Sequence, residues 1–387
     1  MWLIYFCFGI NIASMAPLIA PISEELGVGF SSMGLILGAW PLTYIIASIP
    51  SGILLDRFGA RRMLFVAALI MAASMIARSA AVNSTQMFFA VSILGFGGPL
   101  ISVGAPKVIA GCFQGPSRAS AMGVYVTGPY LGGLVSLSLM NSVVMVFVDQ
   151  NWRAAIFIFA LFTLMSGMLW LVTTNLKGIK VAEDADGKKF NLLAFFELID
   201  LRPVQLILLM SVGIFFINHS LNNWLPEILV GRGLDRVTAG YWASIPSIVG
   251  ILGALIIPRL AVPKYRLYVM AGLFLATFVA SLLLQTDAGP LMFLGLCVQG
   301  LARGSMMTVA ILILMETPKV PADRLGLAGG LFFTVAEIGG VLGPVSFGIL
   351  SDLTGSFAPS LALVTTISAI LMVILIALHR VTLRDYQ

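Results

Sequence analysis

The chain has 387 residues, of which 59% are hydrophobic and only 10% are charged, and its mean hydropathy is +1.03. A water-soluble globule cannot bury so large an apolar fraction, so the composition indicates a polytopic membrane protein. The net charge of +5 comes from cations scattered among short loops, which excludes a nucleic-acid footprint. The three cysteines, Cys7, Cys112 and Cys297, lie in apolar runs without paired spacing, so neither a disulfide framework nor a zinc site is expected.

Twelve apolar runs are long enough to span ~30 Å of hydrocarbon as helices. They cover residues 1–22, 32–55, 63–82, 86–113, 119–146, 154–175, 204–226, 239–261, 267–285, 291–315, 325–350 and 358–379. An even number of spans places both chain ends on one side of the membrane. The first run begins at Met1 without a basic start or a small-residue cleavage site, so no cleavable signal peptide is expected.

The loop between the second and third runs reads Gly52-Ile-Leu-Leu-Asp56-Arg57-Phe-Gly59-Ala-Arg61-Arg62. Gly59 permits a tight reversal, and the arginines suit a cytoplasmic bilayer face. Asp56 is the exception, because a carboxylate near a helix C-terminus faces the unfavourable end of the helix dipole. It is therefore expected to have a partner elsewhere in the protein.

This loop resembles the G-x-L-x-D-R-x-G-x-R-R signature of the major facilitator superfamily. The pattern is matched at Gly52, Leu54, Asp56, Arg57, Gly59, Arg61 and Arg62. The resemblance implies a conformational latch, in which Asp56 contacts the N-terminus of helix 11 near Leu325. The alternative is a positive-inside loop that only sets the topology. One departure is that Gln114 and Gly115 stand where the family often has an acidic residue at the end of helix 4.

The cations also indicate an orientation. If residues 56–62 are cytoplasmic, sixteen Lys or Arg lie on that side of the membrane and three, Arg153, Arg232 and Arg236, lie on the other. This asymmetry follows the positive-inside rule. We therefore expect an inner (plasma) membrane protein with both termini in the cytoplasm.

Residues 177–203 are predicted to form a cytoplasmic linker with an interfacial helix. The linker separates an N-terminal six-helix bundle, residues 1–176, from a C-terminal one, residues 204–387. The halves resemble each other at an offset of about 206 residues: Ile10-Asn11 with Ile217-Asn218, Gly34 with Gly240, Arg118 with Arg324, and Gly132-Gly133 with Gly339-Gly340. Such a repeat is typical of transporters whose two bundles rock around a central site.

Helices 5 and 11 carry related glycine and proline motifs. These are Gly128-Pro129-Tyr-Leu-Gly132-Gly133 and Gly339-Gly340-Val-Leu-Gly343-Pro344. The first resembles the G-P-x-x-G-G motif associated with exporters and antiporters of the superfamily. The alternative is close helix packing alone, which small residues also permit.

Charged residues at membrane depth mark functional candidates, because each costs at least ~2.5 kcal/mol there. Arg303 lies roughly 18 Å into helix 10, with Gln299 one turn earlier on the same face. Glu337 reaches a similar depth in helix 11. Two interpretations remain open. Either Arg303 and Glu337 form a structural ion pair, or Arg303 binds a substrate anion while Glu337 exchanges a proton.

Helix 7 supplies a polar cluster in which Asn218 and Asn222, and His219 and Asn223, form two i, i+4 stripes. At least one stripe should face the cavity. His219 is a candidate proton carrier, since imidazole titrates near neutral pH; a packing role is the alternative.

The resemblance implies that helices 1, 4, 7 and 10 line the cavity. Further candidate contacts are Asn11, Lys107, Tyr44, Tyr125 and Tyr130. For Lys107 the alternative is that its ammonium snorkels to the interface, as we expect for Arg78. Glu316 is expected at the interface.

The run Asn223-Trp224-Leu-Pro226-Glu227 and the glycines after it resemble the cyanate and nitroimidazole transporter branch of the superfamily. Membrane-depth cations suit a small anion, and the first six helices contain no mid-membrane carboxylate of the kind found in many proton-driven drug exporters.

A membrane enzyme is not supported, because no HExxH or GxSxG pattern is present. A channel would show rings or filters rather than a bipartite repeat.

The sequence thus predicts an all-α membrane protein of twelve helices in two pseudo-symmetric bundles. Its predicted function is secondary transport of a small anionic solute by alternating access, with possible coupling to protons. The alternatives are a multidrug exporter working as a proton antiporter, or a receptor on the same fold. We expect a monomer in the lipid bilayer, without a catalytic site, metal, cofactor or nucleic-acid partner.

Overall fold

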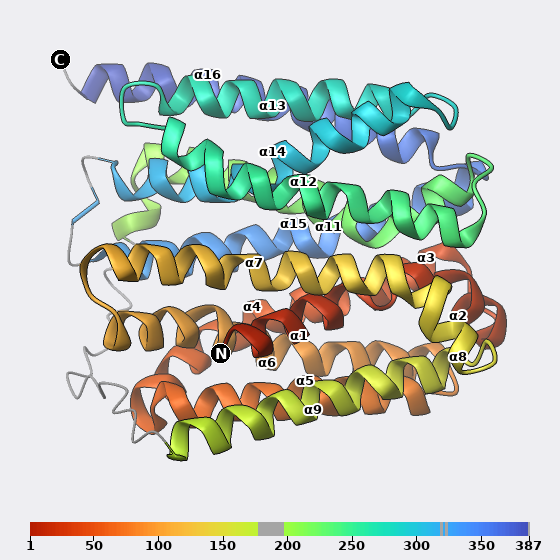
Figure 1. Ribbon diagram of the computed structural model, residues 1–387. Coiled ribbons are helices and arrows are strands. Elements are labelled where there is room, and N and C mark those ends of the chain that lie inside the picture. Colours follow the sequence, from red (N-terminus) through yellow and green to blue (C-terminus); the bar gives the residue numbers. More distant parts are fainter. Residues whose placement is uncertain (177–196, 318–319, 322–323, 386–387) are drawn as a thin grey trace.

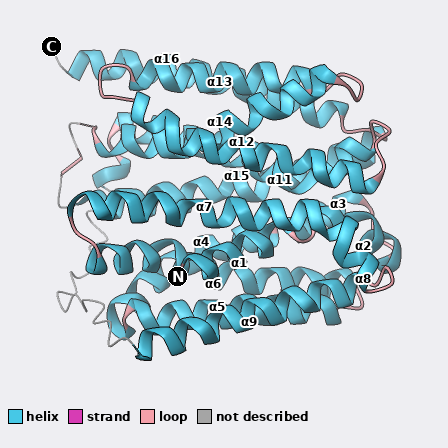
Figure 2. Cartoon of the chain, viewed as in Figure 1, coloured by secondary structure: helices cyan, strands magenta, loops and turns pink. Residues whose placement is uncertain are grey.

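The computed structural model describes residues 1–176, 197–317, 320–321 and 324–385, and within these residues the chain forms helices joined by loops, without strands (Figure 2). The N-terminal half consists of α1 (Trp2–Ala13), η1 (Ala16–Leu18), α2 (Ile19–Leu26), α3 (Phe30–Leu37), α4 (Ala39–Phe58), α5 (Ala60–Ala80), α6 (Ser84–Cys112), α7 (Gly115–Leu139), η2 (Met140–Val144), α8 (Met145–Phe147) and α9 (Trp152–Leu176). The C-terminal half consists of α11 (Arg202–Val230), α12 (Arg236–Leu260), α13 (Arg266–Leu283), α14 (Pro290–Met315), α15 (Leu325–Thr354) and α16 (Ala358–Asp385).

Twelve stretches of the described chain are long and apolar enough to cross a membrane. This confirms the predicted all-α architecture. The first span is interrupted: α1, η1 and α2 together cover Trp2–Leu26, and Pro17 lies in the first turn of η1. Proline is accommodated there because its missing N–H has no intrahelical partner at that position.

The two halves form separate bundles that meet along one seam (Figure 1). In that view the red to yellow-green helices of the N-terminal half lie below the green to blue helices of the C-terminal half. The seam is built by α7 against α12 and by α3 and α4 against α15. Most of the predicted linker, residues 177–196, lies outside the described residues.

The glycines of the two related motifs hold helices together within each bundle. A Cβ atom at Gly132 of α7 would lie 2.0 Å from the backbone oxygen of Phe6 in α1. A Cβ atom at Gly339 of α15 would lie 1.9 Å from the backbone oxygen of Val212 in α11. No side chain fits at either contact. Close helix packing therefore accounts for these glycines.

One side of the bundle contains the turn at Gly59 and the C-terminal end of α16; we call it the basic side (left in Figure 1), and it is the side predicted to be cytoplasmic. The halves are packed tightly on the other side, which we call the opposite side. There, a Cβ atom at Gly34 would lie 2.6 Å from the backbone oxygen of Pro344, and one at Gly240 would lie 2.5 Å from that of Leu137. The two glycines matched by the sequence repeat thus form equivalent contacts across the seam.

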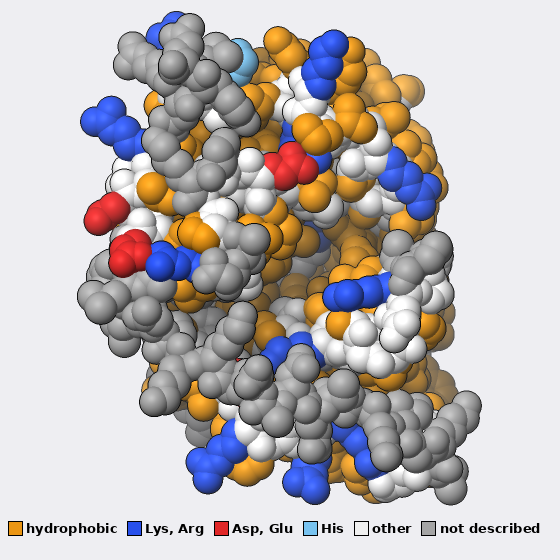
Figure 3. Space-filling view, turned by 90° about the vertical axis from the view of Figure 1, so that its left-hand side faces the viewer, with side chains coloured by type: hydrophobic (Ala, Val, Ile, Leu, Met, Phe, Trp, Pro, Cys, Tyr) orange, Lys and Arg blue, Asp and Glu red, His pale blue; other side chains and the backbone are white. Residues whose placement is uncertain are grey.

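Toward the basic side α4 and α15 diverge. The hydroxyls of Ser48 and Thr334 still meet at 3.0 Å. Beyond them, a Cβ atom at Gly52, Gly329 or Gly330 would have no neighbour within 4 Å among the described atoms. Viewed from this side, the surface is hollowed between the two bundles (Figure 3). The structure is therefore sealed on the opposite side and open on the basic side.

Candidate solute site between the two bundles

Arg303 lies in the middle of α14 and is held by an amide of α11. Its Nη2 atom donates a hydrogen bond of 2.7 Å to Asn222 Oδ1. The adjacent Gly304 lets α14 lie against α12, because a Cβ atom there would come within 2.1 Å of the backbone oxygen of Gly250. Among the described residues no carboxylate forms an ion pair with Arg303. Its positive charge is therefore available to an anion.

Glu337 of α15 faces His219 of α11 instead of Arg303. The His219 Nε2 atom lies 3.7 Å from Glu337 Oε2. Gly340, one turn after Glu337, provides the space for both, because a Cβ atom there would lie 2.4 Å from Oε2 and 3.0 Å from the imidazole. The Arg303–Glu337 ion pair considered from the sequence is thus not formed in this structure. Arg303 is nevertheless close enough to His219 to interact with it electrostatically, so a guanidinium without an ion-pair partner lies near the His219–Glu337 pair.

The N-terminal half adds aromatic side chains to this site. Trp40 of α4 stacks on the His219 ring at 5.1 Å between centroids, and Phe215 of α11, in the same half as His219, stacks on it at 5.6 Å. Tyr130 of α7 is close enough to Arg303 to interact with it electrostatically, as Tyr44 of α4 is to Glu337. The site therefore straddles the seam, with its charges on one bundle and its aromatic groups largely on the other.

Several buried polar atoms on the same three helices lack a hydrogen-bond partner. They are Asn218 Oδ1 on α11, both amide atoms of Gln299 on α14, and Glu337 Oε2 on α15. Buried polar groups are normally satisfied, so such atoms indicate positions that water or a ligand occupies. Amide groups beside a guanidinium can bind a carboxylate at one end of a solute and hydroxyls along the rest. Within the described residues, no cluster of three His, Cys, Asp or Glu side chains forms a metal site.

Asn11 does not share this site, although it is the repeat counterpart of Asn218. It is buried inside the N-terminal bundle, where its Nδ2 atom donates to the backbone oxygen of Cys7 and to Thr163 Oγ1. Its backbone oxygen accepts a hydrogen bond from Arg78 Nη1. Arg78 is only 1% exposed, so the expectation that it snorkels to the interface is wrong. Its Oδ1 atom, like that of Asn218, has no hydrogen-bond partner, but its hydrogen-bonded neighbours all belong to the N-terminal bundle, and these contacts do not support Asn11 as a solute ligand.

Tyr125 also belongs to the interior of the N-terminal half. Its ring stacks on Tyr5 at 4.2 Å, and its hydroxyl donates to the backbone oxygen of Ile101. The two tyrosines connect α7 to α1, and Tyr130, an electrostatic neighbour of Tyr5, also interacts with Arg303. Tyr125 therefore supports the wall of the site in this state.

Asp56 forms an ion pair with Lys107 of α6, within its own bundle. Among the described residues, Asp56 does not form the contact with the N-terminus of helix 11 near Leu325 that the family resemblance implies. The reason is the divergence of α4 from α15 on the basic side, where Gly52 and Gly326 have no close neighbours among the described atoms. Lys107 lies with Asp56 at the mouth of the hollow rather than beside Arg303.

The arginines of the signature loop are anchored in the N-terminal half. Arg61 donates from Nε to Thr174 Oγ1 at 2.9 Å and also binds Asn175, while its backbone oxygen accepts from Trp170. The Arg57 guanidinium lies 5.3 Å from the centroid of the Phe58 ring. Through Arg61 the loop joins the start of α5 to the end of α9.

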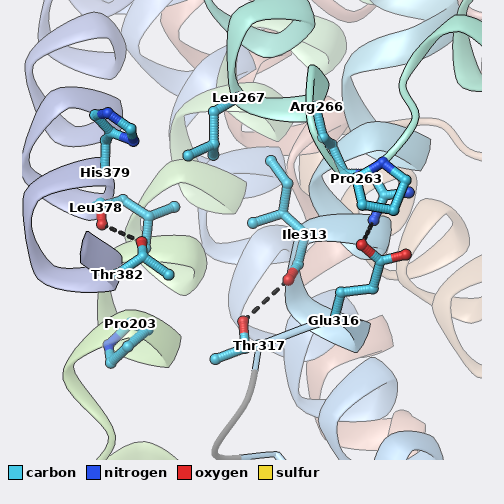
Figure 4. A pocket seen from close by; sticks show the side chains of 10 residues that line it. All are labelled: Pro203, Pro263, Arg266, Leu267, Ile313, Glu316, Thr317, Leu378, His379 and Thr382. Carbon is cyan, nitrogen blue, oxygen red and sulfur yellow. Dashed lines mark hydrogen bonds and ion pairs between the residues drawn. The ribbon is translucent and has the colours of Figure 1, made fainter. Parts of the chain in front are cut away.

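A cavity of about 250 Å³ lies apart from the site, between the ends of α13, α14 and α16 that are on the basic side of the protein (Figure 4). Arg266 and Glu316 form an ion pair at its edge, so their charges offset each other. Ile313 in its wall is ten residues, or ~15 Å of helix, from Arg303. The exposed Glu316 carboxylate agrees with the interfacial position expected for it.

The matching family model is that of the Major Facilitator Superfamily, and it covers residues 1–344. The chain belongs to this superfamily. It is therefore a multi-pass integral membrane transporter. The chain is similar to the solved structure of the nucleoside transporter NupG (D323A mutant), with a TM-score of 0.82 and 16% sequence identity over 97% of this chain and 98% of that one.

Three curated relatives illustrate the range of solutes in the family. The hexuronate transporter of Bacillus subtilis (strain 168) is 24% identical over 87% of this chain and 83% of its own length. The D-galactonate transporter of Escherichia coli O6:H1 is 23% identical over 93% and 90%. The quinolone resistance transporter of Acinetobacter baumannii is 24% identical over 88% and 83%.

Trp40, Phe215 and Gly340 were not identified as site residues from the sequence. Trp40 and Phe215 stand in apolar runs, where an aromatic residue looks like any other lipid-facing or core residue. In the sequence, Gly340 belongs to the motif Gly339-Gly340-Val-Leu-Gly343-Pro344, which by itself indicates only helix packing. No pattern in the chain marks these residues, because their role depends on which helix lies opposite them.

Proposed function

We propose that this transporter carries a small organic anion of the sugar-acid class, and that Arg303 binds the carboxylate. The observation that supports this most directly is a membrane-depth guanidinium whose bonded partner in the site is the neutral amide of Asn222. An arginine left without an acid in low dielectric favours binding of an anion. The unsatisfied amides of Asn218 and Gln299 suit hydroxyl groups on the rest of the solute. Two of the relatives named above are transporters of such acids.

Transport proceeds in this proposal by alternating access. In one state the solute reaches Arg303 and the aromatic side chains of the other half through the hollow on the basic side, and in the other state through the seam on the opposite side after that seam has opened. His219 and Glu337 form the proton-coupling pair, because they are buried together and one of them stacks on Trp40 across the seam. A change of proton occupancy there acts directly on a contact between the two halves.

The test of the anion site is flux into proteoliposomes. Labelled D-glucuronate and D-galactonate are compared with neutral D-glucose, for wild-type protein, Arg303→Ala and the exposed control Arg259→Ala. A desolvated guanidinium–carboxylate contact is worth ~2–5 kcal/mol, so we expect at least a thirtyfold loss of affinity in Arg303→Ala and none in the control. Unaltered affinity for the acids in Arg303→Ala would remove the anion site from the proposal.

The proton-coupling pair is tested separately by pH. Wild-type flux is expected to vary between about pH 5 and 8, the range in which histidine and perturbed carboxyl groups titrate. Glu337→Gln keeps the shape of the side chain and removes its charge, so the pH dependence should flatten while solute binding persists. A pH profile identical to that of the wild type would exclude Glu337 as the coupling residue.

Drug export is the second candidate, and the quinolone resistance relative favours it. The Gly128-Pro129 motif adds little to this reading, because its glycines serve the packing of α7 on α1. The same flux assay with a fluorescent quinolone decides the point. Movement of the quinolone, with none of the acids, would replace the first proposal with the second.

A further inference from the structure

The chain carries the same four-residue pattern, Asp-x-x-Gly, at the ends of two helices on opposite sides of the membrane. Asp56-Arg57-Phe58-Gly59 ends α4 on the basic side, and Asp352-Leu353-Thr354-Gly355 ends α15 on the opposite side. Both glycines adopt positive φ angles, 79° and 71°, which terminate the helix and leave the carboxylate on its last turn. The two helices belong to different bundles and contact each other across the seam.

The Asp352 carboxylate crosses the seam to the first turn of α3. Its Oδ1 atom accepts a hydrogen bond from the Phe30 amide at 3.0 Å, and Oδ2 accepts one from the Ser31 amide at 2.7 Å. These amides have no intrahelical acceptor, and the helix dipole favours a negative charge at this position. Asp352 thus caps a helix of the other bundle rather than its own.

The surroundings are shaped for this contact. A Cβ atom at Gly29 would lie 2.9 Å from Asp352 Oδ2, so the residue before the capped turn is one without a side chain. The Phe30 ring packs at 5.5 Å against both Trp224 and Phe357 of the C-terminal half. A Cβ atom at Gly348 would lie 2.1 Å from the backbone oxygen of Phe30. The amide groups are therefore presented to the carboxylate at a fixed position.

In the same structure, Asp56 is bonded within its own bundle and not across the seam. It is paired with Lys107 inside its own bundle, and within the described part of the chain it forms no hydrogen bond or ion pair with the start of α15. We propose that Asp352 is the latch of the state that is open on the basic side, holding the opposite side shut through the amides of α3. Lys107 retains Asp56 meanwhile. The inference rests on the alternation between two states proposed above and is independent of the solute.

Distances between spin labels measure the ratio of the two states. In a background without other cysteines, labels on Val82→Cys and Ala288→Cys, both exposed, report on the opposite side. Labels on the native exposed Cys112 and on Val262→Cys report on the basic side. Removing a carboxylate from a helix N-terminus should shift the ratio by about two- to tenfold. We expect Asp352→Ala to lengthen the first distance and shorten the second.

Gly29→Ala is an independent variant with unchanged charge, since its methyl group displaces the carboxylate; it should shift the ratio in the same direction. Asp287→Ala, which removes an exposed carboxylate on the same side, and Gly272→Ala, whose surroundings are open, are the controls. If the wild type shows two populations of distances and Asp352→Ala shows them in the same ratio, the latch is overturned, while alternation between two states is still supported. If every variant gives a single distance distribution, at every pH and with every sugar acid, both the latch and the alternation between two states are overturned.

Discussion

The closeness of the halves on the opposite side makes Gly34 a sensitive position. Gly34→Ala places a methyl group 2.6 Å from the backbone oxygen of Pro344, well inside van der Waals contact. The neighbouring atom is backbone and cannot rotate away, so α3 and α15 must separate. Overpacking of this kind costs ~1–3 kcal/mol. Because the cost arises only when the seam is closed, the equilibrium should move roughly 5- to 150-fold toward opening of the opposite side.

The assay is the pair of label distances that reports on the two sides, together with the rate of solute flux. Gly272→Ala is the matched control, since it lies in α13, away from the seam, and its methyl group meets no atom within 4 Å. Gly240→Ala should reproduce the effect on the other half of the seam, where its methyl group would lie 2.5 Å from the backbone oxygen of Leu137. If Gly34→Ala behaves like Gly272→Ala, the closed seam does not depend on this contact and the reasoning fails.

Two further predictions concern the site and its mouth. Gly340→Ala should push Glu337 away from His219 and flatten the pH dependence of flux, as Glu337→Gln does, without loss of folded protein in a thermal melt; a normal pH profile would contradict this role. Lys107→Ala should release Asp56 and shift the label distances toward closure of the basic side by no more than about fivefold, because both partners are nearly half exposed. A large change in solute affinity with unchanged distances would show instead that Lys107 binds the solute.

The fold was predictable because each membrane span is a long run of apolar residues that can be recognised in the sequence. Hydrocarbon admits only helices long enough to cross it, so apolar runs are counted directly, and the repeat at Gly34 and Gly240 predicts a two-bundle arrangement. Arg303 and Glu337 were also identifiable, since a charge at membrane depth requires a compensating partner or a ligand. Their partners were not identifiable. Asn222 and His219 were candidates, yet nothing in the chain pairs one with Arg303 and the other with Glu337.

The sequence by itself determined the class of protein, its twelve spans and the polar residues that lie within the membrane, because each of these follows from the cost of placing a group in hydrocarbon. Tertiary structure alone decided which of those residues meet. Asn11 and Asn218 occupy equivalent positions in the repeat, but one is enclosed among helices of its own bundle and the other lies on the helix that carries His219 and Asn222. Likewise Asp56 and Asp352 end their helices in the same way. Because α4 and α15 diverge toward the basic side, Asp352 contacts the other half, while Asp56 pairs with Lys107 and forms no hydrogen bond or ion pair with the described residues of the other half.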